Sequence, residues 1–244
     1  MIRKDLNTSS LVELLGVEFD KIKDELKNSK FSITDCLKSG LAIFGLKVSS
    51  LLQFDDMVRN KPDQVIHNLK NLYQVNNVPS DTYFRERLDA INEIHRLQYG
   101  MDKIIARLQS GKVLVDYKYI EDSYLVAIDG TGYFSSNKVH CNNCCQKQHR
   151  DGKITYHHNL LSAVMVHPQI KTVFPVALEA IQKQDGSNKN DCERVACRRL
   201  LNTLKRSHPK IKLTIILDAL YVDAKTIKLI KSLGWHYITE LSSK

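Results

Sequence analysis

The sequence has 244 residues, of which 43% are hydrophobic, so it can build the core of one large domain or of two ordinary ones. No run of residues approaches the roughly 20 consecutive apolar positions of a membrane helix, and the amino-terminal segment MIRKDLNTSS lacks the apolar stretch of a secretion signal. These features exclude the membrane-spanning and secreted classes and predict a cytoplasmic protein.

The formal net charge of +9 is distributed unevenly along the chain. Residues 1–122 contain 18 Lys and Arg and 18 Asp and Glu, whereas residues 123–244 contain 18 and 9, so the second half carries the whole excess. Basic side chains that neutralise phosphates release counterions, which favours a polyanionic partner. The charge therefore suits a polyanionic partner, although a merely solvated basic surface would have the same charge.

The first half has the pattern of a helical domain. Apolar residues recur at helical spacing from Ser9 to about Leu108, as in LVELLGVEF and ITDCLKSGLAIFGL. We expect residues 1–112 to form an all-helical, DNA-binding domain.

One segment of this half, NNVPSDTYFRERLDAI, predicts a helix that begins after Pro79, with Ser80 or Asp81 as its cap. Side chains at the start of a groove-reading helix meet base edges and phosphates. Four residues here are candidates for such contacts: Thr82, Tyr83, Arg85 and Arg87. An ordinary amphipathic helix explains the same segment, with three apolar residues facing a core: Phe84, Leu88 and Ile91.

After Gly111 the pattern changes to short β-rich runs such as VLVDYKYI and SYLVAIDGTGYF. The expected elements are strands at 122–134, 155–167 and 171–179, a helix at 191–207, a strand at 211–218, a helix at 223–233 and a strand at 235–241. Consecutive strands followed by alternating helix and strand indicate an α/β domain over residues 113–244. Its predicted architecture is an RNase H-like mixed sheet flanked by helices.

Two carboxylates stand at the ends of apolar runs in this half. Asp129 follows YLVAI and precedes Gly-Thr-Gly, and Asp218 follows LTIIL. We expect each strand to stop there, with its carboxylate at the edge of the sheet. Two such acids repel one another unless a divalent cation lies between them, and oxygen ligands favour Mg²⁺ or Mn²⁺. Either Asp could instead cap a turn.

Three long segments of the chain resemble bacterial insertion-sequence transposases of the DDE type: AIDGTGYFSSNKVHC, GKITYHHNLLSAVMVHP and KQDGSNKNDCERVACRRLL. The resemblance implies an RNase H-like fold, catalysis by Mg²⁺ or Mn²⁺, binding to the ends of the element and to target DNA, and a homodimer that brings two ends together. It implies that Asp129 is the first catalytic acid and Asp218 the second.

These transposases take a third acid, usually Glu, from a helix beyond the last strand expected here, and the sequence stops at Lys244. We therefore expect a truncated catalytic domain, and we interpret Glu240 as a surface position. Glu193 is a further candidate, because the corresponding helix of RNase H-like nucleases can contribute an acid. Asn190 or Asp191 would cap that helix and place Glu193 in its first turn, where it could equally well interact only with the helix dipole.

Cysteine and histidine residues gather between the first two expected strands. Cys141 and Cys144 have the two-residue gap that lets two thiolates bind one zinc ion, and His149 follows closely. The remaining ligands could come from His140, His157, His158 or a distant cysteine. Reduced thiols in a hairpin are the alternative interpretation.

Basic residues of the second half predict a track for DNA phosphates around the acids, with Lys138, Arg194 and Arg198 as its first candidates. Three function hypotheses remain open. The chain is a transposase that cleaves strands and transfers the freed 3′ hydroxyl to target DNA, an RNase H-like nuclease without strand transfer, or a non-catalytic DNA-binding remnant.

Overall fold

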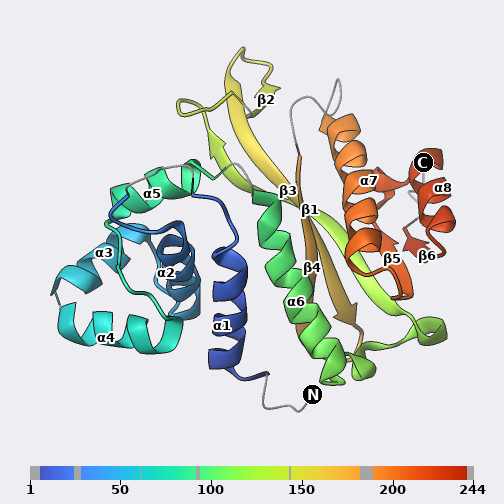
Figure 1. Cartoon of the computed structure of the whole chain (residues 1–244). Helices are drawn as coiled ribbons and strands as arrows, with labels where there is room; N and C mark the ends of the chain where they lie inside the picture. Colours follow the sequence, from blue (N-terminus) through green and yellow to red (C-terminus); the bar gives the residue numbers. More distant parts are fainter. Residues whose placement is uncertain are drawn as a thin grey trace. The chain divides into compact units, whose positions relative to one another are not determined.

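The computed structural model describes residues 6–24, 29–60, 62–91, 94–142, 144–181 and 189–240 (Figure 1). The chain divides into two compact units, residues 1–112 and residues 113–244. In the described ranges no helix is both long enough and apolar enough to cross a bilayer.

The first unit consists of helices. They are α1 (Thr8–Phe19), α2 (Ile33–Gly45), α3 (Leu51–Asn60), α4 (Pro62–Tyr73), α5 (Asp81–Asp89) and α6 (Leu97–Ser110). Capping side chains fix where two of them begin: Asn7 accepts a hydrogen bond from the Ser10 amide, and Ser32 accepts one from the Asp35 amide. Buried residues of α2 to α5, among them Cys36, form the core of this unit.

Helix α5 begins at Asp81, as the sequence predicts. Its residue Phe84 is buried in the core, and Leu88 packs against the same cluster together with Ile91, which follows the helix. The amphipathic interpretation of this segment is therefore confirmed, because the apolar face covers the core of the unit.

The second unit is built on a six-stranded mixed sheet. Its strands are β1 (Tyr124–Ser136), β2 (Cys145–Gln148), β3 (Ile154–His167), β4 (Ile170–Ile181), β5 (Leu213–Leu217) and β6 (His236–Thr239). Strand β3 pairs antiparallel with β1 and with β4, while β5 pairs parallel with β1 and with β6. The order β4-β3-β1-β5-β6 is that of an RNase H-like sheet, so the predicted fold class is confirmed.

Two helices accompany this sheet, α7 (Lys189–Ser207) and α8 (Ala224–Ser232) (Figure 1). Helix α7 packs against β3, β4 and α8. It buries five fully inaccessible side chains at helical spacing: Ala196, Cys197, Leu200, Leu201 and Leu204. This apolar stripe holds α7 on the sheet and fixes the position of the residues at its start.

A buried pair of hydroxyl groups joins β1 to β5 at their amino-terminal ends. The Ser123 and Thr214 side-chain oxygens are 2.7 Å apart, and both residues are about 1% exposed. The adjacent register pairs Tyr124 with Leu213 and continues without a shift to Ile128 and Leu217. A satisfied polar pair in an apolar interface favours this one register over its neighbours.

Two sequence-based expectations about strands are wrong. The first β-rich run, VLVDYKYI, forms a 3₁₀ helix at Val113–Tyr117, because the buried residues Leu114 and Tyr117 are three positions apart instead of alternating. Strand β1 also does not stop at Asp129. Its pairing with β5 ends at Ile128, but its pairing with β3 continues to Ser136.

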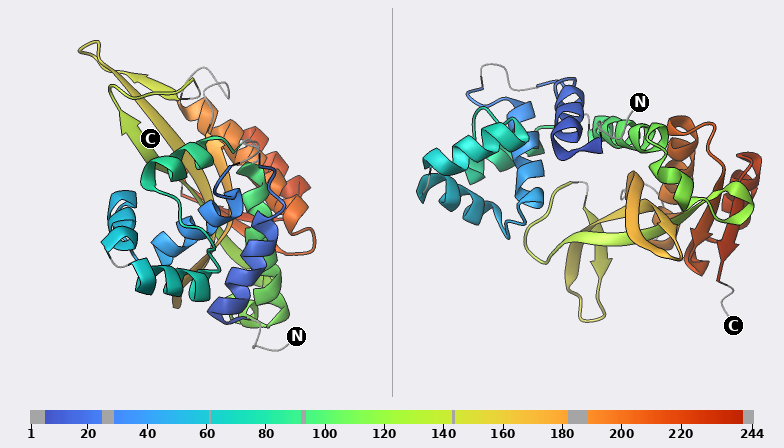
Figure 2. Two further views of the ribbon diagram at one scale, coloured as in Figure 1. Left: turned by 60° about the vertical axis from the view of Figure 1, so that its left-hand side comes forward. Right: turned by 90° about the horizontal axis from the view of Figure 1, so that it is seen from below.

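A hairpin is formed by β2 and the first residues of β3, beyond the part of the sheet where β1 pairs with β5. Strand β2 pairs with the beginning of β3, from Cys145 opposite His157 to Gln148 opposite Ile154. The turn closes where the His149 amide donates to the Lys153 carbonyl at 2.8 Å, and Gly152 takes a φ of +80° that favours glycine. Both views of Figure 2 show this hairpin extending beyond the rest of the sheet.

Candidate functional site

Three acidic residues each lie one position past the last aligned residues of the parallel pairing among β1, β5 and β6. Ile128, Leu217 and Thr239 are aligned across β1, β5 and β6, and the next residues are Asp129, Asp218 and Glu240. All three acids are exposed. Because neighbouring strands lie about 4.8 Å apart, Asp129 and Asp218 are adjacent, whereas Glu240 is two strands away from Asp129.

Tyr221 lies behind these acids. It ends a short 3₁₀ helix, Ala219–Tyr221, that follows Asp218, and its side chain is only 2% exposed. Burial raises the pKa of the Tyr221 hydroxyl, and the negative charges of Glu193, Asp129 and Asp218 raise it further. The phenol therefore stays protonated, and its hydroxyl lies within Coulombic range of three carboxylates.

Gly130 makes room for this tyrosine. A Cβ atom at position 130 would lie 3.0 Å from the Tyr221 hydroxyl oxygen and 3.4 Å from the Leu161 Cδ2 atom. The Gly130 amide also donates a 2.7 Å hydrogen bond to the Asp129 carboxylate. The residue after the first predicted acid thus lets Tyr221 approach and helps to orient that acid.

Glu193 comes from α7 and is buried, with 4% of its surface exposed. The helix begins at Lys189, earlier than the sequence suggests, so Glu193 lies at the start of its second turn instead of in the first. The proposed caps Asn190 and Asp191 have side chains outside the described residues. The Arg194 Nε atom donates to the Leu220 carbonyl at 2.9 Å, which ties this part of α7 to the segment after Asp218.

The carboxylates around Tyr221 do not form a compact ligand set. In the described part of the chain, one group of three or more His, Cys, Asp and Glu residues has ligand atoms that all lie within 4.8 Å of one another: Cys141, Cys144 and His158. This cluster could bind a metal ion. The acids supply oxygen ligands at a shared edge but are more widely spaced.

The cluster contains the two predicted cysteine ligands, Cys141 and Cys144. Its histidine is His158, whereas the sequence favours His149. The sulfur atoms of Cys141 and Cys144 are 3.6 Å apart, and each is 3.2 Å from the His158 Nε2 atom. His149 lies outside the cluster, because its Nε2 atom is 2.8 Å from the Thr155 hydroxyl in the hairpin turn. Cys144 is 1% exposed, and burial raises the pKa of its thiol.

A cleft of about 440 Å³ lies between the start of α7 and the start of α8. Its lining includes Arg194, Arg198, Asp223 and Lys225. One terminal nitrogen of Arg198 is 3.1 Å from the Asp223 carboxylate and 3.4 Å from the Thr226 hydroxyl. Two of the predicted DNA-binding residues, Arg194 and Arg198, thus share a basic cleft, while Lys138 is exposed in the segment between β1 and β2.

The four predicted DNA contacts of α5 divide into two pairs. Thr82 and Arg85 are exposed. Arg87 is 2% exposed and forms an ion pair with Asp24, and the Tyr83 hydroxyl lies 2.5 Å from the Ser29 hydroxyl. Arg87 is thus engaged within its own unit, and its contact with DNA stays a prediction that this burial does not support.

Sequence reasoning missed three features of the site: the position of Tyr221, the reason for Gly130 and the place of Glu240 in the row of acids. A tyrosine three residues after Asp218 carries no signal by itself. The position of Glu240 requires the parallel register of β5 and β6, which residue patterns do not contain.

No protein family model matches the chain, and no curated protein matches it. Among solved structures, the chain is similar to a pre-cleavage Mos1 transpososome, with 9% sequence identity and a TM-score of 0.26. The alignment covers 97% of this chain and 79% of the other. The likeness is too distant to support an argument about function.

Proposed function

We propose that this chain is a DDE-type transposase that uses a divalent metal ion to cleave DNA strands at insertion-sequence ends and to transfer them to target DNA. The observation that carries the proposal is the alignment of Asp129 and Asp218 just past the end of the parallel pairing between β1 and β5, with Glu193 in charge range of the same tyrosine.

The donor set fits a hard cation. Asp129 and Asp218 are exposed, so both carboxylates are accessible to an ion and to a DNA phosphate. Carboxylate oxygens suit Mg²⁺ and Mn²⁺, and such ions activate an attacking hydroxyl and stabilise a leaving phosphate oxygen. The protonated Tyr221 hydroxyl, close to Gly130, would offer one hydrogen-bond donor to a carboxylate of the site. Glu193 would add a third negative charge to the site.

Basic residues next to the acids would hold the DNA backbone. Arg194 and Arg198 line the cleft between α7 and α8, and the segment that links Asp218 to Tyr221 contacts α7 through Arg194. Guanidinium groups bind phosphate with paired hydrogen bonds. Two element ends must be joined in one reaction, so we infer a homodimer as the active form.

The experiment uses linear DNA that contains this gene with several hundred base pairs of its own flanking sequence. The 244-residue chain, with Mn²⁺, should nick this DNA near the element ends, and Asp129→Asn and Asp218→Asn should abolish nicking. Asp116→Asn is the matched control, because this exposed acid lies in the 3₁₀ helix before β1, away from the acidic edge. Equal nicking by all four proteins would overturn the proposal.

A second candidate function is a non-catalytic DNA-binding protein. It is favoured by the spacing of the acids, which do not bring three ligand atoms within 4.8 Å of one another among the described residues. Salt-dependent binding to the same DNA without nicking, in Mg²⁺ and in Mn²⁺, would support it. Nicking without joining of a labelled 3′ end to a target plasmid would instead indicate an RNase H-like nuclease.

A further inference from the structure

The strongest feature outside the acidic edge is the Cys141–Cys144–His158 cluster at the base of the hairpin. Its ligands come from two places: the cysteines lie between β1 and β2, and His158 lies in β3 opposite Phe134 of β1. One ion bound here would connect the segment before the hairpin to the strand that follows it.

The three atoms have the spacing of ligands around one ion. Tetrahedral zinc with ordinary bond lengths separates two thiolate sulfurs by about 3.8 Å and a sulfur from an imidazole nitrogen by about 3.6 Å. The observed separations are 3.6 Å between the sulfurs and 3.2 Å from each sulfur to the His158 Nε2 atom. A point about 2.0–2.3 Å from all three atoms therefore exists above their triangle, and small movements complete the geometry.

The protein around the cluster holds the ligands in place. The Cys144 amide donates to the Cys141 carbonyl at 3.2 Å, which closes a tight turn, and the Cys141 amide donates to the Cys144 sulfur at 3.3 Å. The His158 ring stacks on Tyr133, with ring centroids 5.8 Å apart, and contacts Phe134 from a second side. These contacts fix the positions of the Cys144 sulfur and the His158 ring.

The neighbouring cysteine and histidine are turned away from the cluster. The Cys145 sulfur faces the Ile181 carbonyl at 3.8 Å, and the His140 ring stacks on Tyr156 with centroids 4.2 Å apart. The described residues thus supply three ligands, two thiolates and one imidazole. Two sulfurs and one nitrogen suit zinc, whereas the carboxylates at the acidic edge suit Mg²⁺.

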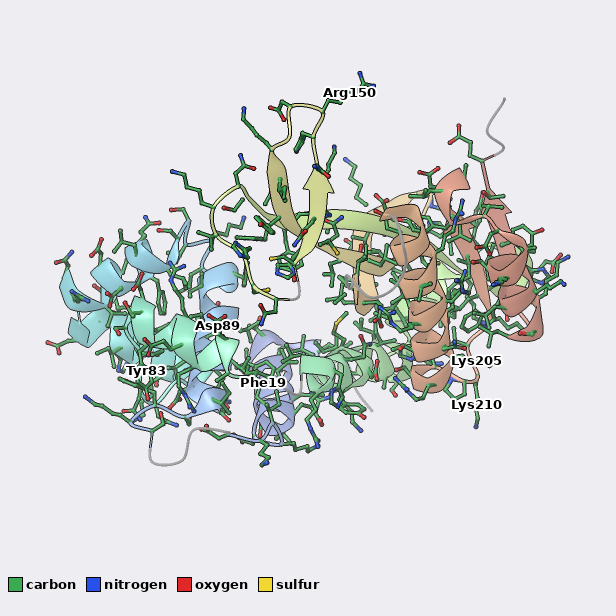
Figure 3. The ribbon with its side chains drawn as sticks, turned by 90° about the horizontal axis from the view of Figure 1, so that it is seen from above. Phe19, Tyr83, Asp89, Arg150, Lys205 and Lys210 are labelled. Carbon is green, nitrogen blue, oxygen red and sulfur yellow. The ribbon has the colours of Figure 1, made fainter. Side chains whose placement is uncertain are left out.

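We propose that Cys141, Cys144 and His158 bind one Zn²⁺ ion, with water in the fourth position, and that this ion fixes the base of the β2–β3 hairpin. Binding releases the thiol protons and forms two zinc–sulfur bonds and one zinc–nitrogen bond. The hairpin carries exposed cations at Lys147, Arg150 and Lys153, and Figure 3 shows Arg150 at its tip. Zinc would hold these cations in a fixed direction at one end of the sheet.

The test measures zinc on the purified full-length chain. After equilibration with micromolar Zn²⁺ and removal of free metal, the wild-type protein should retain about one zinc per chain by elemental mass spectrometry. Cys141→Ser and His158→Ala should lose it. Cys145→Ser and His149→Ala are matched controls of the same residue types. Cys145 is the first residue of β2 and His149 directly follows this strand. Both variants should retain the zinc ion.

The variants must be compared as folded proteins. Cys144 is buried, so Cys144→Ser could fail to fold, whereas Cys141 is exposed and Cys141→Ser should keep the wild-type circular dichroism spectrum. Cobalt provides an independent readout: Co²⁺ in the wild-type site should show tetrahedral d–d bands and a sulfur charge-transfer band, and Cys141→Ser, which should not retain the metal, should lack both.

Three results would overturn the proposal. These are a folded wild-type protein that retains no zinc, zinc retained equally by Cys141→Ser and His158→Ala, and an intact mass lower by two hydrogens that shows a Cys141–Cys144 disulfide. The readouts need neither DNA nor strand cleavage, so the zinc site and the proposed catalytic activity can fail independently.

Discussion

The Tyr221 hydroxyl occupies the space that a side chain at position 130 would need, because a Cβ atom there would lie 3.0 Å from its oxygen. Gly130 directly follows Asp129, and Tyr221 is the third residue after Asp218. The two acid-bearing segments are therefore packed against each other through a glycine and a buried phenol.

Gly130→Ala should lower the free energy of unfolding by about 1–3 kcal/mol, the usual cost of an added methyl group in a packed site. Because the closest contact is the hydroxyl oxygen, Tyr221→Phe should remove most of that cost. Urea unfolding of the two single variants and the double variant gives the coupling energy. Additive effects within about 0.5 kcal/mol would contradict the contact.

Glu193 and Glu240 are rival candidates for a third catalytic acid. Glu193 is within charge range of the Tyr221 hydroxyl together with Asp129 and Asp218, whereas Glu240 lies two strands from Asp129. We expect Glu193→Gln to slow Mn²⁺-dependent nicking about 100-fold, as for residues that support a metal site. Glu240→Gln should stay within about threefold of wild type. The reverse order, in proteins of equal melting temperature, would assign the role to Glu240.

Arg87 and Arg85 of α5 should respond in opposite ways to truncation. Arg87→Ala empties a buried position and removes the ion-pair partner of Asp24, whose side chain is 35% exposed, so it should cost about 1–3 kcal/mol of stability. Arg85 is exposed and forms only a 3.6 Å ion pair with Asp81, so Arg85→Ala should change stability by less than about 0.5 kcal/mol.

The salt dependence of DNA binding tests whether Arg85 contacts phosphates. If α5 contacts phosphates, Arg85→Ala should lower the slope of log affinity against log salt by about 1. Fluorescence anisotropy with the flanking DNA measures this slope. An unchanged slope in Arg85→Ala would exclude α5 from the interface.

Asp223 should make stability depend on pH. Burial disfavours its charged form, but hydrogen bonds from Thr226 and the charges of Arg198 and Arg194 outweigh this, so the pKa of Asp223 lies below its ordinary value. A lowered folded-state pKa gives stability that is present above the unfolded pKa near 3.8 and is lost as pH falls through the folded value.

The corresponding variant is Asp223→Ala, which removes the cap of α8, where the carboxylate accepts from the Thr226 amide at 2.6 Å. We expect a loss of about 1 kcal/mol at pH 7. The difference from wild type should shrink as pH falls below about 4, because the wild-type carboxyl is then protonated too. Urea unfolding at several pH values measures it, with Asp116→Asn as the control. A difference that is constant down to pH 2 would show that the charge contributes nothing.

The sheet was largely predictable because long apolar runs mark its strands. The runs at 155–167 and 211–218 correspond to β3 and β5 within a few residues, and the helix expected at 191–207 corresponds to α7. Whether β1 stops at Asp129 or runs on to about residue 134 could not be decided from the sequence, because the continuation depends on pairing with β3, a partner some 30 residues away in the chain. Polar residues such as Ser135 can form a strand when a neighbouring strand supplies hydrogen bonds.

For the candidate site residues, too, the sequence did not show contacts with partners distant in the chain. Asp129 and Asp218 could be selected from strand ends, and the Cys141–Cys144 spacing pointed to a metal, but the third member of that cluster could not be chosen among several nearby histidines. Alternation along β3 decides it: Cys145 is paired with His157, and His158 lies on the other face. The burial of Arg87 was not predictable either, because sequence alone does not show that Asp24 is its partner.

The hydrogen bond between Ser123 and Thr214 lies several residues before the acids, yet their alignment depends on it. A slip of one residue between β1 and β5 would turn one of the two carboxylates to the opposite face. If the proposed activity holds, its mutational sensitivity should therefore reach Ser123 and Thr214, two small buried hydroxyl side chains outside the row of acids. A loss of activity on substitution of Ser123 or Thr214 would then come from a changed register between β1 and β5, with Asp129 and Asp218 still present.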